Sequence, residues 1–224
     1  MTSLAGAVVL VVGATGGLGS RIARDLEAAG ATVIRSGRLA AGSDVVLGDL
    51  RTRGAAASIV DQAVARHGRL DGLVIAAGVV AFGPVTELPD GALKDLFEVN
   101  VMGPIQLVRA SIPHLTASGE QGREPFIVTL TGIVAETPTA NLAAYSASKT
   151  GLRAFIVAAA RELRRASIRV LDARPGHTET SLSRHPVAGT APPFPPGLDP
   201  DAVSARIVRA IVDNERDLPS TEFR

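Results

Sequence analysis

The sequence contains no cysteine, which excludes disulfide bonds, thiol nucleophiles and cysteine-ligated metals. Aromatic side chains make up only 3% of its 224 residues, so the core must be built mainly from Ala, Val, Leu and Ile. A chain without cysteine fits a reducing compartment, and we expect a cytoplasmic protein.

The sequence also lacks a strong excess of either charge, because 23 basic and 22 acidic residues leave a formal net charge of +1. General nucleic-acid binding and membrane-surface binding need concentrated positive charge, which this balance does not supply. No apolar run reaches the roughly 20 residues that span a bilayer. The apolar stretch "AGAVVLVV" has no basic segment before it and runs into a glycine-rich turn, which indicates a buried strand. We expect no nucleic acid and no membrane among the partners.

Metal-binding and serine-hydrolase motifs are missing as well. The four histidines, His67, His114, His177 and His185, stand at none of the close spacings that bind zinc. No G-x-S-x-G elbow occurs, which disfavours a serine hydrolase. We therefore predict that the protein holds no metal.

Short apolar runs alternate with amphipathic segments along the chain. The runs are continuously apolar, as is typical of a parallel sheet covered by helices on both faces. This pattern predicts an α/β, doubly wound, Rossmann-type three-layer fold with a mostly parallel central sheet, in a single domain over residues 1–224. We expect strands within 7–14, 31–37, 44–50, 70–78, 125–132, 168–176 and 217–223, and helices within 18–30, 53–68, 88–115, 143–166 and 199–215.

Three glycines, Gly13, Gly17 and Gly19, stand between the first expected strand and the first expected helix, in "GATGGLG". Glycine lets the backbone approach a pyrophosphate, and the free N–H groups of the helix N-terminus attract its charge. Many strand–helix turns need glycine for their own geometry, and this spacing differs from the common G-x-G-x-x-G fingerprint. The motif alone leaves both interpretations open.

The only tyrosine, Tyr145, precedes Lys149 by four residues, and Lys94 is the only other lysine. On a helix this spacing places both side chains on one face. A nearby ammonium favours the phenolate and lowers the tyrosine pKa from its usual value of about 10, which suits general acid–base catalysis. The alternative is a surface tyrosine with a solvated neighbour.

Together these motifs resemble the short-chain dehydrogenases/reductases, over nearly the whole chain and in the family's order. The resemblance implies an NAD(P)-dependent oxidoreductase that interconverts a carbonyl and a secondary alcohol. It assigns proton transfer to Tyr145, ribose binding to Lys149 and a bound water to Asn100. Tyr145 and Lys149 thus count as cofactor contacts too, and the further cofactor-binding residues that it implies are Gly13, Thr15, Gly17, Leu18, Gly19, Asp49, Leu50, Ala77, Gly78, Pro175, Gly176, Thr178 and Thr180.

The chain departs from the family at Gly132, where the family usually carries a serine that binds the substrate oxygen. We predict that Thr131 substitutes for it, provided that a bulge or turn at Gly132 brings its hydroxyl round. Adjacent strand side chains point to opposite faces, so the alternative is that Thr131 packs within the strand and the hydroxyl is absent. That absence would favour a non-catalytic or weakly active nucleotide-binding regulatory protein.

Cofactor preference is predicted from the end of the second expected strand. NAD-preferring members place an acidic residue there, on the adenosine ribose. Here Gly37 takes that place and Arg38 follows, with Arg35 nearby as a second candidate. Arginine pairs bidentately with a phosphate, so we predict a preference for NADP(H), with NAD(H) possible.

The proline-rich segment 185–198 predicts a loop. We expect a small carbonyl or alcohol substrate, of apolar or mixed character, under a loop at about 181–198. His177 and His185 flank this loop and either touch substrate or lie on the surface. The resemblance implies a homodimer or homotetramer formed through residues 89–117 and 145–165. The early end at "STEFR", without the glycine-rich tail of many family tetramers, favours the dimer.

Overall fold

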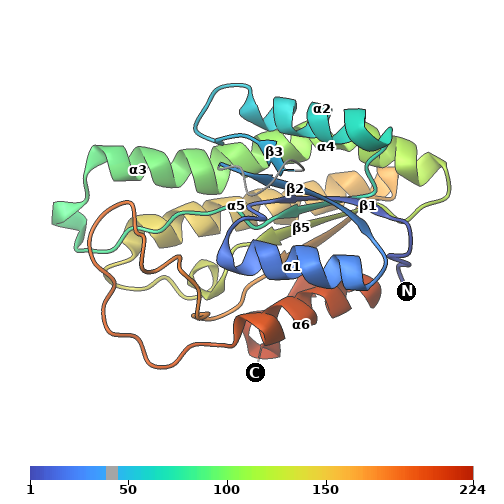
Figure 1. Ribbon diagram of the computed structural model, residues 1–224. Helices are drawn as coiled ribbons and strands as arrows, with labels where there is room; N and C mark the ends of the chain where they lie inside the picture. The colour runs from blue at the N-terminus through green and yellow to red at the C-terminus, as the bar shows by residue number, and fades with distance from the viewer. Residues whose placement is uncertain (39–44, 224) are drawn as a thin grey trace.

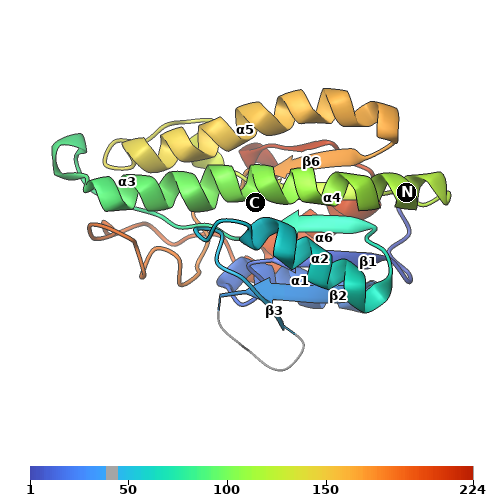
Figure 2. The same ribbon diagram turned by 90° about the horizontal axis from the view of Figure 1, so that it is seen from above.

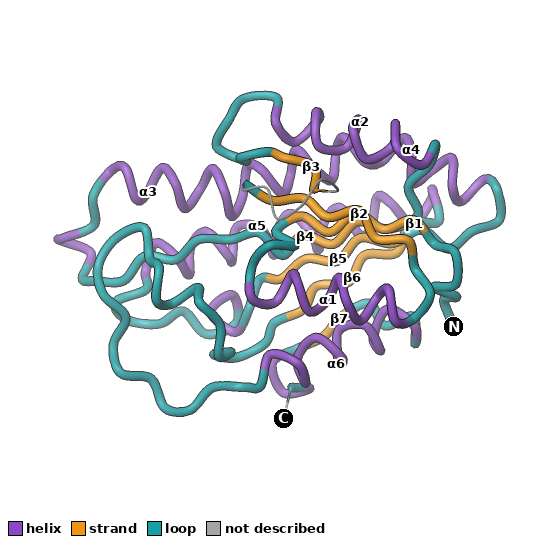
Figure 3. The backbone as a smooth tube through the Cα atoms, viewed as in Figure 1, coloured by secondary structure: helices purple, strands orange, loops and turns teal. Residues whose placement is uncertain are grey.

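The computed structural model describes residues 1–38 and 45–223. A seven-stranded sheet forms the centre of this part of the molecule. The strand order is β3-β2-β1-β4-β5-β6-β7, and every neighbouring pair is parallel (Figure 3). The predicted doubly wound, Rossmann-type fold is therefore confirmed. The strands are β1 (Val8–Val12), β2 (Thr32–Gly37), β3 (Val45–Leu47), β4 (Gly72–Ile75), β5 (Phe126–Leu130), β6 (Arg169–Ala173) and β7 (Asp217–Leu218).

Helices cover both faces of the sheet (Figure 1, Figure 2). Helices α1 and α6 pack together on one face, and α2, α4 and α5 cover the other. The helices are α1 (Gly17–Ala28), α2 (Ala55–His67), α3 (Asp90–Phe97), α4 (Gly103–Glu120), α5 (Ala143–Leu163) and α6 (Pro200–Val212).

Strand β1 shows why the apolar runs are continuous. Its five residues are all buried, with Val9 and Val11 packed toward α1 and α6 and with Leu10 and Val12 packed toward α2, α4 and α5. Each fully buried side chain of this size contributes about 1.5–3 kcal/mol to folding. A strand with two buried faces therefore needs apolar residues at every position.

The carboxyl ends of β1 and β4 lie side by side, with Val12 opposite Ile75. From β1 the sheet extends through β2 and β3 in one direction and through β4 to β7 in the other. Connections leave this point toward opposite sides, and ligands of open α/β sheets bind in the crevice that results. The fold thus places the glycine turn after β1 at the expected ligand position.

The expected helical region 88–115 is divided by a change in helix type. Helix α3 runs into a π-helical turn at Glu98–Met102, which continues directly into α4. Single π-helical turns inside α-helices are common at functional sites. This turn carries Asn100.

The segment after β6 contains the predicted proline-rich loop, which has no helix or regular strand between Thr180 and Asp199. Two isolated backbone bridges hold it, one between Ala81 and Ala188 and one between Thr178 and Leu198. The loop therefore lies at the carboxyl edge of the sheet, next to the connections that follow β4 and β6 (Figure 1).

Candidate active site

The glycine turn after β1 packs tightly against the turn after β4. Gly13 has a φ of +87°, and a Cβ atom at this position would lie 2.5 Å from the backbone N of Ala77. A side chain would therefore be both strained and obstructed. A Cβ at Gly17 would lie 2.7 Å from Cβ of Thr180, so the turn also meets the segment after β6. The structure thus brings three of the predicted cofactor-binding segments together.

The N-terminus of α1 keeps the features of an anion site. Gly16 caps the helix without a side-chain hydrogen bond, and the first turn contains no acidic residue. Its first N–H groups are available to a phosphate. Beside the turn, the Ser36 hydroxyl is fully buried and makes no hydrogen bond within the described residues. These features fit a bound dinucleotide.

The end of β2 separates the two candidate arginines. Arg35 is held by Glu27 of α1 in a bidentate ion pair, with N–O distances of 2.5 and 2.8 Å. This pairing makes Arg35 the less available of the two candidates. Arg38 is exposed just beyond the strand. A Cβ at Gly37 would lie 2.6 Å from Oγ1 of Thr15, so Thr15 occupies the space that an acidic side chain at position 37 would need.

Asp49 and Leu50 follow β3, as the resemblance required, but Asp49 is already paired. Its carboxylate accepts hydrogen bonds from the Arg51 guanidinium, the shortest at 2.5 Å. These hydrogen bonds lower the pKa of Asp49. Leu50 is buried and packs at Gly103. Sequence reasoning missed Arg51, which belongs to no motif.

Tyr145 and Lys149 share one face of α5, as their spacing predicts. The Lys149 Nζ lies 5.9 Å from the centroid of the Tyr145 ring and donates a 2.8 Å hydrogen bond to the carbonyl of Leu130. Lys149 is only 6% exposed, so this is not a solvated surface lysine. The carbonyl of β5 fixes the ammonium beside the phenol.

The pKa values of this pair differ from the sequence-based expectation. Burial raises the pKa of Tyr145 to about 12. Burial lowers the pKa of Lys149 to about 8, and the negative charge of Asp172 opposes that change. In the protein alone the Tyr145 pKa thus moves in the direction opposite to the expectation, and the loss of solvent is the cause.

Asn100 is fully buried in the π-helical turn and joins the turn after β4 to α5. Its Oδ1 accepts a 2.9 Å hydrogen bond from Val79 N, and its Nδ2 donates to Val79 O at 2.9 Å and to Ser148 Oγ at 3.0 Å. A Cβ at Gly78 would lie 3.4 Å from both Asn100 Oδ1 and Lys149 Nζ. Asn100, Gly78 and Lys149 are therefore neighbours, whereas the role of Ser148 had no sequence signal.

Thr131 does not replace the missing serine. Gly132 does turn the chain, with a φ of +74°, but Thr131 is fully buried and its Oγ1 donates a 2.7 Å hydrogen bond to Asp172 Oδ2. The prediction that Thr131 enters the site is therefore wrong, and the alternative that it packs within the sheet is correct. Its hydroxyl satisfies a buried carboxylate instead of facing the substrate.

The segment after β6 closes the site. Pro175 is buried and its carbonyl accepts a 2.9 Å hydrogen bond from Ile133 N in the turn after β5. Gly176 follows it, and its carbonyl accepts a 3.0 Å hydrogen bond from Thr178 Oγ1. These contacts hold the segment against the ends of β5 and β6.

The loop above the site is closed by an aromatic contact. The ring of His177 stacks on Phe194, with centroids 4.5 Å apart, and Phe82 lies 6.0 Å from Phe194. The predicted flanking residue His185 instead bonds through Nδ1 to the carbonyl of Ser181 at 2.9 Å. Of the two histidines, only His177 stacks on an aromatic side chain of this loop among the described residues.

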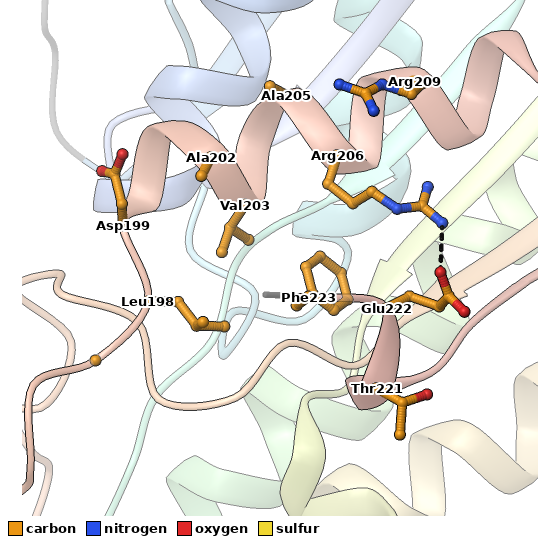
Figure 4. A pocket seen from close by; sticks show the side chains of 11 residues that line it. Leu198, Asp199, Ala202, Val203, Ala205, Arg206, Arg209, Thr221, Glu222 and Phe223 are labelled. Carbon is orange, nitrogen blue, oxygen red and sulfur yellow. Dashed lines mark ion pairs between the residues drawn. The ribbon is translucent and has the colours of Figure 1, made fainter.

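A second concavity lies away from these residues. A groove of about 840 Å³ separates α6 from the C-terminal segment, with Val203 and Phe223 between its walls and an Arg206–Glu222 ion pair at 3.5 Å (Figure 4). None of the proposed catalytic residues lines it. Among the described residues no cluster of three potential metal ligands occurs, and no helix is long and apolar enough to cross a membrane.

The doubly wound sheet, with its glycine turn at the switch point, is typical of dinucleotide-binding proteins, and the neighbouring Tyr145 and Lys149 are a pair suited to proton transfer beside a nicotinamide. Comparison with known proteins agrees. A model of the short chain dehydrogenase family matches residues 7–189. The chain belongs to this family and is an NAD(P)-dependent dehydrogenase/reductase.

Individual relatives resemble the chain over most of its length. An uncharacterized oxidoreductase of Methylorubrum extorquens is 32% identical over 195 residues, which cover 80% of this chain and 76% of the relative. The structure of a 3-ketoacyl-(acyl-carrier-protein) reductase from Brucella melitensis, complexed with NADH, has a TM-score of 0.86 at 25% identity and covers 97% of both chains. A short chain dehydrogenase from Burkholderia cenocepacia in complex with NADP has a TM-score of 0.81 at 26% identity, covering 98% of this chain and 90% of its own.

Proposed function

We propose that this protein is an NADP(H)-dependent enzyme that interconverts a small-molecule carbonyl and the corresponding secondary alcohol, with Tyr145 as proton donor and acceptor. The observation that carries this proposal is that Lys149 and Asn100 are buried beside Gly78, with the ring of the partly buried Tyr145 5.9 Å from Lys149 Nζ. A helix-surface tyrosine with a solvated lysine would need none of these contacts.

Tyr145 suits the reductive direction. With its pKa raised to about 12, the phenol is protonated at neutral pH and can donate to a carbonyl oxygen as charge develops there. Lys149 stabilises the phenolate that this transfer leaves behind, because its ammonium lies over the same ring. A bound nicotinamide ring supplies or accepts the hydride. Alcohol oxidation would need additional positive charge near Tyr145 to form the phenolate first.

The proposed preference for NADP(H) rests on the end of β2. Thr15 fills the space beside Gly37, so an acidic residue that would accept ribose hydroxyl groups is absent and has no room. Arg38 is exposed directly after it and can meet a 2′-phosphate. The related structures contain NADH in one case and NADP in another, so the family alone does not decide the preference.

A second candidate function is supported by Gly132. With no serine at that position and with Thr131 bonded to Asp172, Tyr145 is the only proposed catalytic residue with a hydroxyl to offer the substrate. A nucleotide-binding protein with regulatory function and little turnover would fit this loss. The buried Asn100 and Lys149 favour the enzyme, because a binder has less need of them.

One experiment separates the two functions. NADPH oxidation is followed against a panel of ketones and aldehydes, with wild type and Tyr145→Phe in parallel, and NADPH binding is measured for both by calorimetry. We expect turnover in the wild type and a loss of about 100-fold or more in the variant, with NADPH binding retained. Wild-type protein that binds NADPH but turns over no substrate would establish the regulatory alternative.

We further propose that the substrate lies beneath the loop at about 181–198, whose Phe194 and His177 form an apolar, aromatic cover. Assembly as a homodimer through α4 and α5 is part of the same proposal. Met102, just before α4, and Val157 on α5 are 52% and 48% exposed, so both apolar side chains are accessible to a second copy of the chain.

A further inference from the structure

A buried polar cluster joins the neighbouring strands β5 and β6. Asp172 of β6 stands opposite Thr129 of β5 in the register of the sheet. Its Oδ1 accepts a 2.8 Å hydrogen bond from Thr129 Oγ1, and its Oδ2 accepts a 2.7 Å hydrogen bond from Thr131 Oγ1. All three residues are at least 96% buried, with Asp172 the most exposed at 4%. The carboxylate therefore clamps two threonines of the neighbouring strand.

Arg174 completes the cluster from the far side. It is 2% exposed, and its guanidinium donates to Asp172 Oδ2 at 3.1 Å, to both carboxylate oxygens of Asp217 at 2.7 and 2.9 Å, and to Glu136. Burial raises the pKa of the Asp172 carboxyl, whereas the hydrogen bonds from Thr131, Thr129 and Arg174 oppose that rise. Three donors and no described acceptor surround Asp172, which is the environment of a carboxylate.

The hydrogen-bonded group of Asp172, Thr129 and Thr131 is linked to Lys149 through the peptide group of Leu130. Leu130 lies between the two clamped threonines, and its carbonyl accepts the 2.8 Å hydrogen bond from Lys149 Nζ. The polar and titratable groups that face this ammonium are Tyr145 on its own helix, Asn100 from the π-helical turn and Asp172 from β6. Asp172 is the only acidic group among them.

We propose that Asp172 is a positioning residue for Lys149: through Thr129 and Thr131 its carboxylate fixes the Leu130 carbonyl that holds the lysine ammonium beside Tyr145. The proposal deepens the proposed function and rests on it for its catalytic meaning. A buried carboxylate is costly, and apolar residues of similar size would stabilise the sheet as well or better. The cluster is explained by what it does to Lys149.

The two-lysine composition makes this proposal directly measurable. Protein labelled with ¹³C and ¹⁵N in lysine gives side-chain signals from Lys94 and Lys149 only. Lys94→Arg assigns them, and the exposed Lys94, with 72% of its side chain accessible, supplies a reference signal in every sample. Titration of the Lys149 signal is followed in ligand-free protein, so no substrate or cofactor is needed.

In wild type we expect the Lys149 signal to titrate near pH 8. Asp172→Asn should lower this midpoint by about one pH unit, because the negative charge that favours the ammonium is removed. Thr131→Val keeps the carboxylate but releases one side of the clamp, and should lower the midpoint by about half a unit. Thr131→Ser restores the hydroxyl and should return the wild-type midpoint.

Circular dichroism and thermal unfolding of each variant establish that it is folded before its titration is interpreted. If Asp172→Asn does not fold, the Thr131→Val and Thr131→Ser pair decides alone. A folded Thr131→Val protein whose Lys149 titrates at the wild-type midpoint would overturn the proposal. Failure of the proposed function has a different signature, because it would leave these titrations unchanged while wild type turned over no carbonyl substrate.

Discussion

At the scale of single residues, the site depends on burial as much as on charge. Tyr145 and Lys149 are close together, yet removal from solvent favours the neutral form of each. It raises the pKa of Tyr145 and lowers the pKa of Lys149. The phenol therefore keeps its proton at neutral pH, and the lysine is still mostly charged there but loses its proton at a lower pH than a free lysine does. A catalytic group whose pKa lies near the operating pH responds most strongly to its surroundings.

The lowered pKa of Lys149 predicts a specific pH dependence of carbonyl reduction. Below about pH 8 the lysine is charged and supports the developing phenolate, and above that pH it loses its proton. We expect kcat/KM for NADPH, which reports the free enzyme, to fall as pH rises through about 8, measured at a fixed substrate concentration between pH 6 and about 10. A rate that is flat across this range would contradict the role given to Lys149.

The same shift has a consequence for stability. The folded pKa of Lys149 lies below its ordinary value of 10.5, so between about pH 8 and 10.5 the unfolded chain binds more protons than the folded one. The contribution of this group to the free energy of unfolding therefore rises with pH across that window. Urea unfolding of wild type and Lys149→Met at both ends of the window tests the sign.

At the scale of secondary-structure elements, the exit of β2 selects between cofactors. We expect Arg38→Ala to weaken NADPH binding by about tenfold or more while NADH binding changes little, since only NADPH carries the 2′-phosphate. Titration of both cofactors by fluorescence measures this. Arg35→Ala is the matched control, because that guanidinium is paired with Glu27 and its loss should leave both affinities unchanged. An equal loss of both cofactors in Arg38→Ala would rule out the phosphate contact.

The elements also separate what the sequence could predict from what it could not. Tyr145 and Lys149 were found because helical spacing fixes which side chains share a face. The π-helical turn around Asn100 was not found, because hydrophobic periodicity does not distinguish an added residue in one helical turn. The choice between Arg35 and Arg38 depends on the ion pair of Arg35 with Glu27. That pair forms only when α1 packs beside β2, so it is a tertiary contact that the sequence pattern does not show.

The wrong prediction for Thr131 also comes from a tertiary contact. Strand alternation left its direction open, and a glycine at position 132 was compatible with either outcome. The deciding residue was Asp172, which lies 41 positions along the chain and becomes a neighbour only through the pairing of β5 with β6. Such cross-strand carboxylates, with Arg174 behind them, belong to no motif that a single sequence displays.

At the scale of the whole molecule, the two helical layers differ in what they leave exposed. Helix α5, in the layer of α2, α4 and α5, carries the proposed catalytic residues Tyr145 and Lys149, and Val157 on the same helix is 48% exposed. We expect the protein to elute as a homodimer in size-exclusion chromatography with light scattering. Val157→Glu should shift it toward monomer, whereas Val85→Glu, at an exposed residue outside α4 and α5, should not. A wild-type monomer would refute the proposed interface.

The two backbone bridges that hold the loop after β6 determine which of its residues can change without moving the loop. Both are made by main-chain atoms, at Ala81 with Ala188 and at Thr178 with Leu198, so neither depends on which side chains lie between them. Within the stretch that they enclose, Gly189 has a φ of +71° and no room for a Cβ beside the Phe82 carbonyl, and Phe194 stacks on His177, so the residues free to vary are 190–193. We expect changes at these positions to leave the anchors, and the cofactor-side segments to which they are attached, in place.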